Sequence, residues 1–120
     1  MAKRILVIGA VALGPKAASR CKRLMPDAEV TLIDQSSRIS YGGCGIPYFI
    51  SDEVKNVAEL QSTPYGAIRN EQFFEKHKDI KTLTNCQATH IDRKERIVTV
   101  QNLIDGSAST LSYDSLVLAL

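Results

Sequence analysis

The sequence predicts an α/β fold in which a parallel β-sheet is joined by a small antiparallel β-meander. Two stretches of strand character, residues 4–8 and 29–34, flank a stretch with helical periodicity. This strand–helix–strand order is typical of a βαβ unit, whose strands lie parallel. Farther along, apolar and polar residues alternate over residues 87–92, 96–101 and 110–113. Such alternation, interrupted by short turns, predicts antiparallel strands.

Length, composition and charge exclude several classes of protein. The 120 residues suffice for one small domain, and 44% hydrophobic with 23% charged residues is ordinary for a globular chain. A formal net charge of +2 is too small to indicate nucleic acid or a membrane surface as a partner. No apolar run is long enough for a membrane span, and the N-terminus lacks a signal-peptide pattern. We therefore expect a cytoplasmic protein.

The loop after the first strand has features of a phosphate-binding loop. Gly9 and Gly14 bound it, and Pro15 suits the first turn of the following helix. The N-terminus of such a helix offers free N–H groups and a positive dipole end to a pyrophosphate. The pattern G-x-G-x-x-G would need glycine where this chain has Val11. By itself, the loop is therefore also compatible with a plain strand-to-helix turn.

The helix that follows has two distinct faces. Its spacing predicts that one face packs on the sheet, formed by Ala17, Ala18, Cys21, Leu24 and Met25, and Pro26 ends it. The opposite face carries the basic residues Lys16, Arg20 and Arg23. These are either a solvated charged face, which the spacing alone favours, or a docking stripe for a phosphate-rich ligand.

An acidic residue ends the second strand. Asp34 lies twenty residues after Gly14, where a carboxylate can accept hydrogen bonds from the ribose of an adenosine. Loop, helix, strand and acid together are far more specific than the loop alone. They predict a Rossmann-like unit that binds an adenine nucleotide.

The three cysteines form no C-x-x-C pair and indicate no metal site; reduced thiols are expected instead. Cys21 and Cys86 are interpreted as core residues. Cys44 lies between two glycines, and Pro47 predicts a helix that starts at about Gly45 and whose N-terminus would favour the thiolate. An isolated cysteine here would be a buried residue in a glycine-rich turn. Beside a nucleotide site, a reactive thiol is the better interpretation.

The second half of the chain is less regular. Thr63 and Pro64 have the pattern of a helix start, and Asn70 is a candidate cap for a helix over residues 71–77. Residues 80–84 predict a short strand, and Asp105–Gly106 a hairpin turn. The apolar run 115–120 predicts a buried parallel strand.

Several motifs together resemble one known family. They cover residues 9–14, 18–24, 30–34, 40–48 and 113–119, and the cysteine motif at 40–48 is the most specific. The chain resembles the N-terminal FAD-binding segment of the pyridine nucleotide–disulfide oxidoreductases. It is most similar to the single-cysteine branch, which contains coenzyme A-disulfide reductases, NADH oxidases and persulfide reductases. Valine at position 11 is common in this branch.

The resemblance implies roles for particular residues. Asp34 would hold the ribose of FAD, Gln35 would lie near the adenosine, Ala88 would meet the adenine, and Ala119 would lie against the cofactor. Cys44 would be the redox thiol, reduced by the flavin after hydride transfer from NADH or NADPH. The pyrophosphate would be lined by Gly9, Ala10, Val11, Ala12 and Gly14.

The resemblance also suggests a substrate and a larger assembly. Arg20, Arg23, Ser40 and Gly43 match positions that contact coenzyme A, although Gly43 stands where asparagine is frequent. Residues 1–120 would form the N-terminal part of an FAD/NAD(P)-binding domain, a fragment of a longer homodimeric enzyme and inactive alone. The alternatives are a stand-alone adenine-nucleotide-binding module without turnover, or an NADH oxidase or peroxidase of the same branch.

Overall fold

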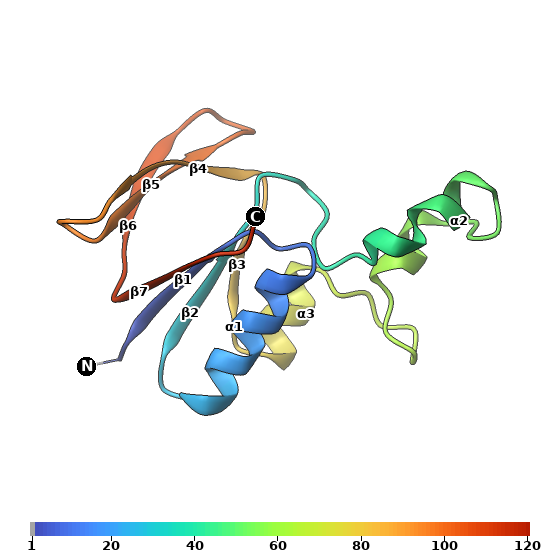
Figure 1. Cartoon of the computed structure of the whole chain (residues 1–120), viewed down its shortest axis with the longest axis horizontal. Coiled ribbons are helices and arrows are strands. Elements are labelled where there is room, and N and C mark those ends of the chain that lie inside the picture. Colours follow the sequence, from blue (N-terminus) through green and yellow to red (C-terminus); the bar gives the residue numbers. More distant parts are fainter. Residues whose placement is uncertain (1) are drawn as a thin grey trace.

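A computed structural model describes residues 2–120 as two β-sheets with helices on one side (Figure 1). The larger sheet has four parallel strands in the order β3-β2-β1-β7. These strands are β1 (Arg4–Ile8), β2 (Glu29–Ile33), β3 (Lys81–Leu83) and β7 (Ser115–Leu118). Helix α1 (Leu13–Leu24) connects β1 to β2, and α3 (Glu71–His77) precedes β3. The predicted βαβ unit and parallel sheet are confirmed.

The smaller sheet is the predicted antiparallel meander. It consists of β4 (Cys86–Asp92), β5 (Ile97–Asn102) and β6 (Ala108–Ser112) in sequence order. The predicted turn at Asp105–Gly106 joins β5 to β6, and Gly106 has a φ of +76°, which glycine adopts without strain. The predicted limits of the strands differ from the observed ones by one or two residues.

The parallel sheet is buried on both faces, so the chain has two apolar cores. On one face, alternate residues of β1 and β2 pack with Ala18 of α1 and Phe74 of α3. On the other face, Leu6, Ile8 and Ile33 pack with Val98 and Val100 of the meander. In Figure 1, α1 and α3 lie on one side of the sheet and the meander on the other. This arrangement is the usual reason why parallel strands are continuously apolar.

Residues 41–69 leave these layers as an arm, drawn mostly in green in Figure 1. The arm contains a 3₁₀ turn (Gly43–Gly45), α2 (Ile46–Ile50) and a second 3₁₀ segment (Val57–Gln61). The helix predicted near Gly45 is therefore confirmed, with Pro47 in its first turn. At its base, the arm is closed by a hydrogen bond from the Gly42 N–H to the Leu60 carbonyl, 2.8 Å.

The helix start predicted at Thr63 and Pro64 is wrong. Thr63 caps a turn instead, because its Oγ1 accepts from the Ala67 N–H at 3.1 Å and its carbonyl accepts from the Gly66 N–H at 3.0 Å. A bridge between Ser62 and Ile68 closes this turn. The threonine–proline pattern fits a turn as well as a helix, and the glycine that follows decides in favour of the turn.

Two predictions of burial are also wrong. Leu24 and Met25 were expected on the buried face of α1 but are 64% and 37% exposed, because they lie at the end of the helix just before β2 begins. The last strand ends at Leu118, which is 56% exposed. Since β7 is the edge strand of the sheet, part of its side-chain surface lacks a neighbour. No helix within residues 2–120 has the length and apolar character needed to cross a membrane.

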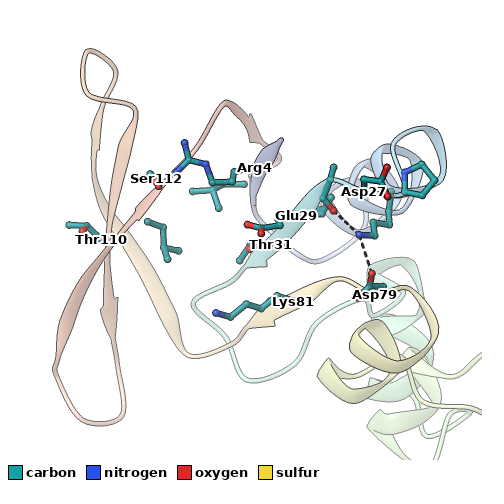
Figure 2. A pocket seen from close by; sticks show the side chains of 14 residues that line it. Arg4, Asp27, Glu29, Thr31, Asp79, Lys81, Thr110 and Ser112 are labelled. Carbon is teal, nitrogen blue, oxygen red and sulfur yellow. Dashed lines mark hydrogen bonds and ion pairs between the residues drawn. The ribbon is translucent and has the colours of Figure 1, made fainter. Parts of the chain in front are cut away.

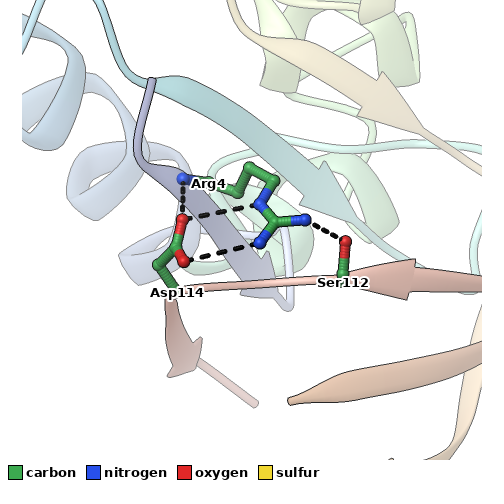
Figure 3. A network of polar contacts seen from close by, with 3 residues as sticks. All are labelled: Arg4, Ser112 and Asp114. Carbon is green, nitrogen blue, oxygen red and sulfur yellow. Dashed lines mark hydrogen bonds and ion pairs between the residues drawn. The ribbon is translucent and has the colours of Figure 1, made fainter. Parts of the chain in front are cut away.

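The starts of β1 and β7 are joined by a polar cluster that is visible in Figure 3. The Arg4 N–H donates to Asp114 Oδ2 at 2.7 Å, and the Arg4 guanidinium lies 3.5 Å from both carboxylate oxygens. The guanidinium also donates to the Ser112 hydroxyl. The backbone hydrogen bond from Arg4, followed by the guanidinium contact, lowers the pKa of Asp114 below its ordinary value.

A pH dependence of stability follows from this cluster. Because the folded-state pKa of Asp114 is depressed, its contribution to stability is present above the unfolded-state pKa and is lost as pH falls through the folded value. Asp114→Asn is expected to lower the free energy of unfolding near neutral pH. The difference from wild type should begin to shrink at about pH 4 and vanish only below the folded-state pKa of Asp114. Urea unfolding across this pH range measures it. Asp27→Asn, at an exposed aspartate, is the control, and an equal effect of both variants would contradict the assignment.

Candidate functional site

The loop between β1 and α1 depends on its two glycines. Gly9 has a φ of +107°, and a Cβ there would lie 2.2 Å from the Ala119 carbonyl oxygen at the end of β7. A Cβ on Gly14 would lie 1.6 Å from the Gly9 carbonyl oxygen. The first glycine therefore permits the turn, and the second lets α1 approach the strand. These are the geometric requirements of a nucleotide-binding βα turn, and the loop meets them with Val11 between the glycines.

Asp34 fixes this loop to the end of β2. Its Oδ2 accepts from the Ala10 N–H at 2.8 Å, and its Oδ1 accepts from the Ser36 N–H at 2.9 Å and the Ser36 hydroxyl at 2.7 Å. A carboxylate has about four acceptor positions, so Asp34 can accept one more hydrogen bond. The side chain can therefore hold the loop and a ligand hydroxyl together.

Ala10 is fully buried, and both of its backbone polar groups are engaged. Its N–H donates to Asp34, and its carbonyl accepts from the Ser40 N–H at 2.7 Å. Ala10 was expected to line the pyrophosphate. Because its N–H already donates to Asp34, we expect it to position the loop and not to donate to a phosphate.

A cavity of about 610 Å³, here called the loop cavity, lies at the carboxyl ends of the parallel strands. Ligands of open α/β sheets bind at this edge. The structure brings six of the nine predicted cofactor residues to its wall: Gly9, Val11, Asp34, Gln35, Ala88 and Ala119. Cys86 also lines it as a buried thiol, and burial raises its pKa, so it is a poor nucleophile.

A second cavity of about 790 Å³, here called the arginine cavity, lies between α1 and the base of the arm. No acidic side chain is among its lining residues, and no ion pair within residues 2–120 involves its cations. The predicted substrate residues Arg20, Arg23 and Ser40 line it, whereas Gly43 does not. Its five cationic side chains are Lys16, Arg20, Arg23, Arg69 and Lys78. Lys16, Arg20 and Arg23 are exposed, as on a solvated face, and they also line a concave surface whose charge suits an anionic ligand.

The two cavities adjoin, because Val11 and Tyr41 line both of them. Cys44 follows Tyr41 closely in the sequence and lies exposed in the first 3₁₀ turn of the arm, outside the residues that line either cavity. Of the other predicted residues, Ala12 lines the arginine cavity, while Gly14 is buried behind the loop. Cys21 is half-buried against the core, as predicted.

Sequence reasoning missed Arg69 and Lys78, and gave Tyr41 no role. Arg69 and Lys78 flank α3, far along the chain from Arg20 and Arg23. Only the packing of α3 beside α1 brings them to the same cavity, so no local spacing could have predicted them. For Tyr41, the one sequence signal was its place in the cysteine motif at residues 40–48; the structure adds that it lines both cavities.

A third cavity, shown in Figure 2, lies at the opposite, amino edge of the sheet. Its charges are mixed and partly paired, since Lys22 Nζ donates to the Ala28 carbonyl at 2.6 Å and lies 3.1 Å from Asp79 Oδ2. It contains none of the predicted site residues. Within the described part of the chain, no group of histidine, cysteine and acidic side chains is arranged to hold a metal ion.

The family can be stated from the sequence match. The profile of the family described as pyridine nucleotide-disulphide oxidoreductase matches residues 3–120. The chain belongs to this family. Coenzyme A disulfide reductase of Staphylococcus haemolyticus is 35% identical over 118 residues, which are 98% of this chain and 25% of that protein. NADH oxidase of Enterococcus faecalis is 31% identical over 116 residues, covering 96% of this chain and 24% of that protein.

Solved structures of the family have the same fold. An NAD-dependent persulfide reductase from A. fulgidus has a TM-score of 0.92 and 42% identity, covering 96% of this chain and 21% of that one. A water-forming NADH oxidase from Lactobacillus brevis has a TM-score of 0.84 and 26% identity, and the match covers 98% of this chain and 24% of that one. The chain thus spans about a quarter of the length of the curated relatives that it matches.

Proposed function

We propose that residues 1–120 form the N-terminal part of the FAD-binding domain of an NAD(P)H-dependent oxidoreductase. It reduces the disulfide or persulfide of a phosphate-bearing thiol, such as coenzyme A, through Cys44. The observation that carries this proposal is the arginine cavity beside the nucleotide-type loop, with the exposed Cys44 two residues after Gly42, which lines that cavity. Similarity to proteins named coenzyme A disulfide reductase and persulfide reductase supports it.

The residues at the loop cavity fit FAD. The N-terminus of α1 has no side-chain cap and no acidic residue in its first turn, which suits a pyrophosphate at Val11 and Ala12. Asp34 keeps an acceptor position for a ribose hydroxyl, and Gln35 and Ala88 line the same cavity. Bound FAD would accept a hydride from NADH or NADPH and supply two electrons to the sulfur of Cys44.

The chemistry proposed for Cys44 is thiol–disulfide exchange. Its thiolate attacks one sulfur of the substrate disulfide, the S–S bond breaks, and one thiol leaves after taking a proton. The other half of the substrate stays on Cys44 as a mixed disulfide, which two electrons and a proton reduce to thiolate and the second thiol. An exposed sulfur between two glycines leaves room for a bulky substrate.

The arginine cavity supports a phosphate-bearing substrate. A thiol that carries several phosphate groups would accept charge-assisted hydrogen bonds from Arg20 and Arg23. The Ser40 hydroxyl adds a neutral donor. Glutathione disulfide and cystine carry no phosphate and would make fewer such bonds. The rest of the enzyme, including its NAD(P)H-binding part and a homodimer interface, is proposed to lie outside these residues, so we expect the isolated segment to be inactive.

Steady-state kinetics on the product of the complete reading frame tests the proposal. We expect a yellow, flavin-containing protein that oxidises NADH or NADPH anaerobically with coenzyme A disulfide, at a kcat/KM well above that for glutathione disulfide or cystine. A colourless protein that binds ADP without turnover would favour the stand-alone nucleotide-binding module instead. Equal kcat/KM for all three disulfides would contradict the phosphate-bearing substrate.

NADH oxidase activity is a second candidate, because the Enterococcus faecalis relative bears that name and Cys44 is accessible to small oxidants. In this case the reducing equivalents pass to oxygen. An oxygen electrode distinguishes the two, because a disulfide reductase consumes little oxygen when NADH is supplied without a disulfide.

Flavin retention is expected to depend on Asp34. Asp34→Ala removes the acceptor of the Ala10 N–H and the proposed ribose acceptor at once. A hydrogen bond to a charged group contributes about 1.5–3 kcal/mol, so the dissociation constant for FAD should rise at least about tenfold. The flavin-to-protein absorbance ratio after dialysis measures it, with Asp27→Ala at the opposite edge of the sheet as control. Unchanged flavin content in Asp34→Ala would contradict this role.

A further inference from the structure

One cation of the arginine cavity, Arg69, is held in place by the protein. It lies at the end of the arm, directly before the Asn70 cap of α3. Its Nε donates to the Gln61 carbonyl at 3.1 Å, and its backbone N–H donates to the same oxygen at 3.0 Å. Arg69 is half-buried as a residue, and no carboxylate is among the residues that line the cavity.

Gln61 is itself fixed from the other side. It is a buried polar residue whose Nε2 donates to the Ile39 carbonyl at 2.8 Å and whose Oε1 accepts from Arg38 Nη1 at 3.2 Å. Ile39 directly precedes Ser40, which lines the same cavity. Gln61 therefore ties Arg69 to the segment that leads into the cysteine motif.

This anchoring has a consequence for binding. A flexible arginine loses side-chain entropy when it binds, and one that is already fixed at Nε loses less. Its two terminal nitrogens form a fork that matches a phosphate, which a lysine cannot reproduce. The other lining cations come from α1 and from the residue after α3, whereas Arg69 comes from the arm.

We propose that Arg69, held by Gln61, is a specificity-determining residue that binds a phosphate group of the substrate from the arm side of the arginine cavity. The inference rests on the proposed function, because it names how that enzyme selects phosphate-bearing disulfides. It assigns the selectivity to a residue outside the family-like motifs and gives the arm a part in substrate choice.

The first test compares two substrates in the product of the complete reading frame. Coenzyme A disulfide carries phosphate, whereas pantethine has the same thiol end without phosphate. In Arg69→Gln, the ratio of kcat/KM for coenzyme A disulfide to that for pantethine should fall about tenfold. The matched control is Arg93→Gln, which removes the same charge from the exposed turn between β4 and β5 and should leave the ratio unchanged. An equal loss for both substrates would mean a structural role and overturn the inference.

The conservative variant tests the anchored fork. Arg69→Lys keeps the charge but loses both the Nε anchor and the planar pair of donors. We expect Arg69→Lys to recover less than half of the decrease that Arg69→Gln causes in the ratio of kcat/KM for coenzyme A disulfide to that for pantethine. Full restoration would show that the charge alone matters, and the specific role of the fixed guanidinium would be overturned.

Binding without turnover separates this inference from the proposed function. Titration calorimetry with adenosine 3′,5′-bisphosphate should give a dissociation constant about tenfold higher in Arg69→Gln than in wild type. If this holds while coenzyme A disulfide is not a substrate, the proposed function fails and the role of Arg69 as an anion-binding residue stands. If affinity is unchanged, that role is overturned even where the enzyme reduces coenzyme A disulfide.

Circular dichroism checks that the variants fold. If Arg69→Gln does not fold, a chemical modification experiment on the wild-type protein takes its place. Phenylglyoxal modifies the arginines, and mass spectrometry identifies which ones have reacted. The bisphosphate should protect Arg69 and leave Arg93 reactive. Equal modification of Arg69 with and without the bisphosphate would overturn the inference.

Discussion

Cys44→Ser in the product of the complete reading frame is expected to abolish disulfide and persulfide reduction while flavin content stays at the wild-type level. At neutral pH a serine hydroxyl stays protonated and is too weak a nucleophile to replace a thiolate. It also cannot form a mixed disulfide. Loss of a nucleophile commonly lowers kcat by a thousandfold or more, so turnover should fall below about 0.1% of wild type.

Flavin retention is the informative half of this prediction. Cys44 lies in the exposed 3₁₀ turn of the arm, and the loop cavity is lined without it. The substitution should therefore leave the proposed cofactor site intact. Anaerobic NADH oxidation with coenzyme A disulfide, measured beside the flavin spectrum of the same sample, gives both results. Turnover near the wild-type rate would contradict the assignment of Cys44.

The other cysteines provide the matched control. Cys21 is half-buried against the core under α1, and its replacement by serine should leave turnover near wild type. Iodoacetamide should label Cys44 fastest, because Cys86 is buried and its pKa is raised by desolvation. Faster labelling of either other cysteine would contradict the interpretation of Cys44 as the reactive thiol.

Sequence reasoning was most successful where neighbouring residues determine the structure. Gly9, Gly14 and Asp34 lie within one βαβ unit, and the residue type at each position already indicates its geometric role. These roles are a positive φ, a close approach of helix to strand, and a hydrogen-bond acceptor at a strand end. The Asn70 cap was predicted in the same way, and its side chain accepts from the Phe73 N–H at 3.0 Å. Local chemistry at these positions leaves few alternatives.

Burial was harder to predict, because it depends on distant neighbours. The 3.6-residue period assigns Leu24 to a face of α1, but only the tertiary structure shows that the sheet does not reach it. Leu118 has the apolar character of a central strand, yet β7 lies at the edge of the described sheet. Periodicity therefore predicts the direction in which a side chain points, and the layers of the fold decide whether anything covers it.

The arginine cavity shows the same limit at the functional site. Arg20 and Arg23 share a helix face, and the spacing of such residues favours solvent. Their meaning changes when Arg69 and Lys78 join them across a concave surface without acidic residues. Because these residues are far apart in the sequence, the lining of the arginine cavity could not be predicted without the fold, whereas Gly9, Val11 and Asp34 of the loop cavity lie within one βαβ unit.

Gly14→Ala is expected to destabilise the protein by about 3 kcal/mol and to lower its flavin content. Helix propensity alone predicts the opposite sign, because alanine is favoured over glycine within a helix by about 1 kcal/mol. The close approach of α1 to the loop decides the outcome. The added Cβ would lie 1.6 Å from the Gly9 carbonyl oxygen and 3.4 Å from a methyl group of Val7. Backbone atoms cannot rotate away as a flexible side chain can, so α1 must shift.

Gly43→Ala is the matched control for this effect. A Cβ at Gly43 would meet no atom within 4 Å, and no positive φ is required there. This variant should therefore change the free energy of unfolding by less than about 1 kcal/mol, with a small gain from the reduced freedom of the unfolded chain. Urea unfolding of both variants measures the contrast. Because the shift of α1 would move its N-terminus away from the loop cavity, flavin should be lost from Gly14→Ala at a urea concentration that leaves Gly43→Ala fully loaded. Equal stability of the two variants would mean that helix and strand are not held in close contact at Gly14.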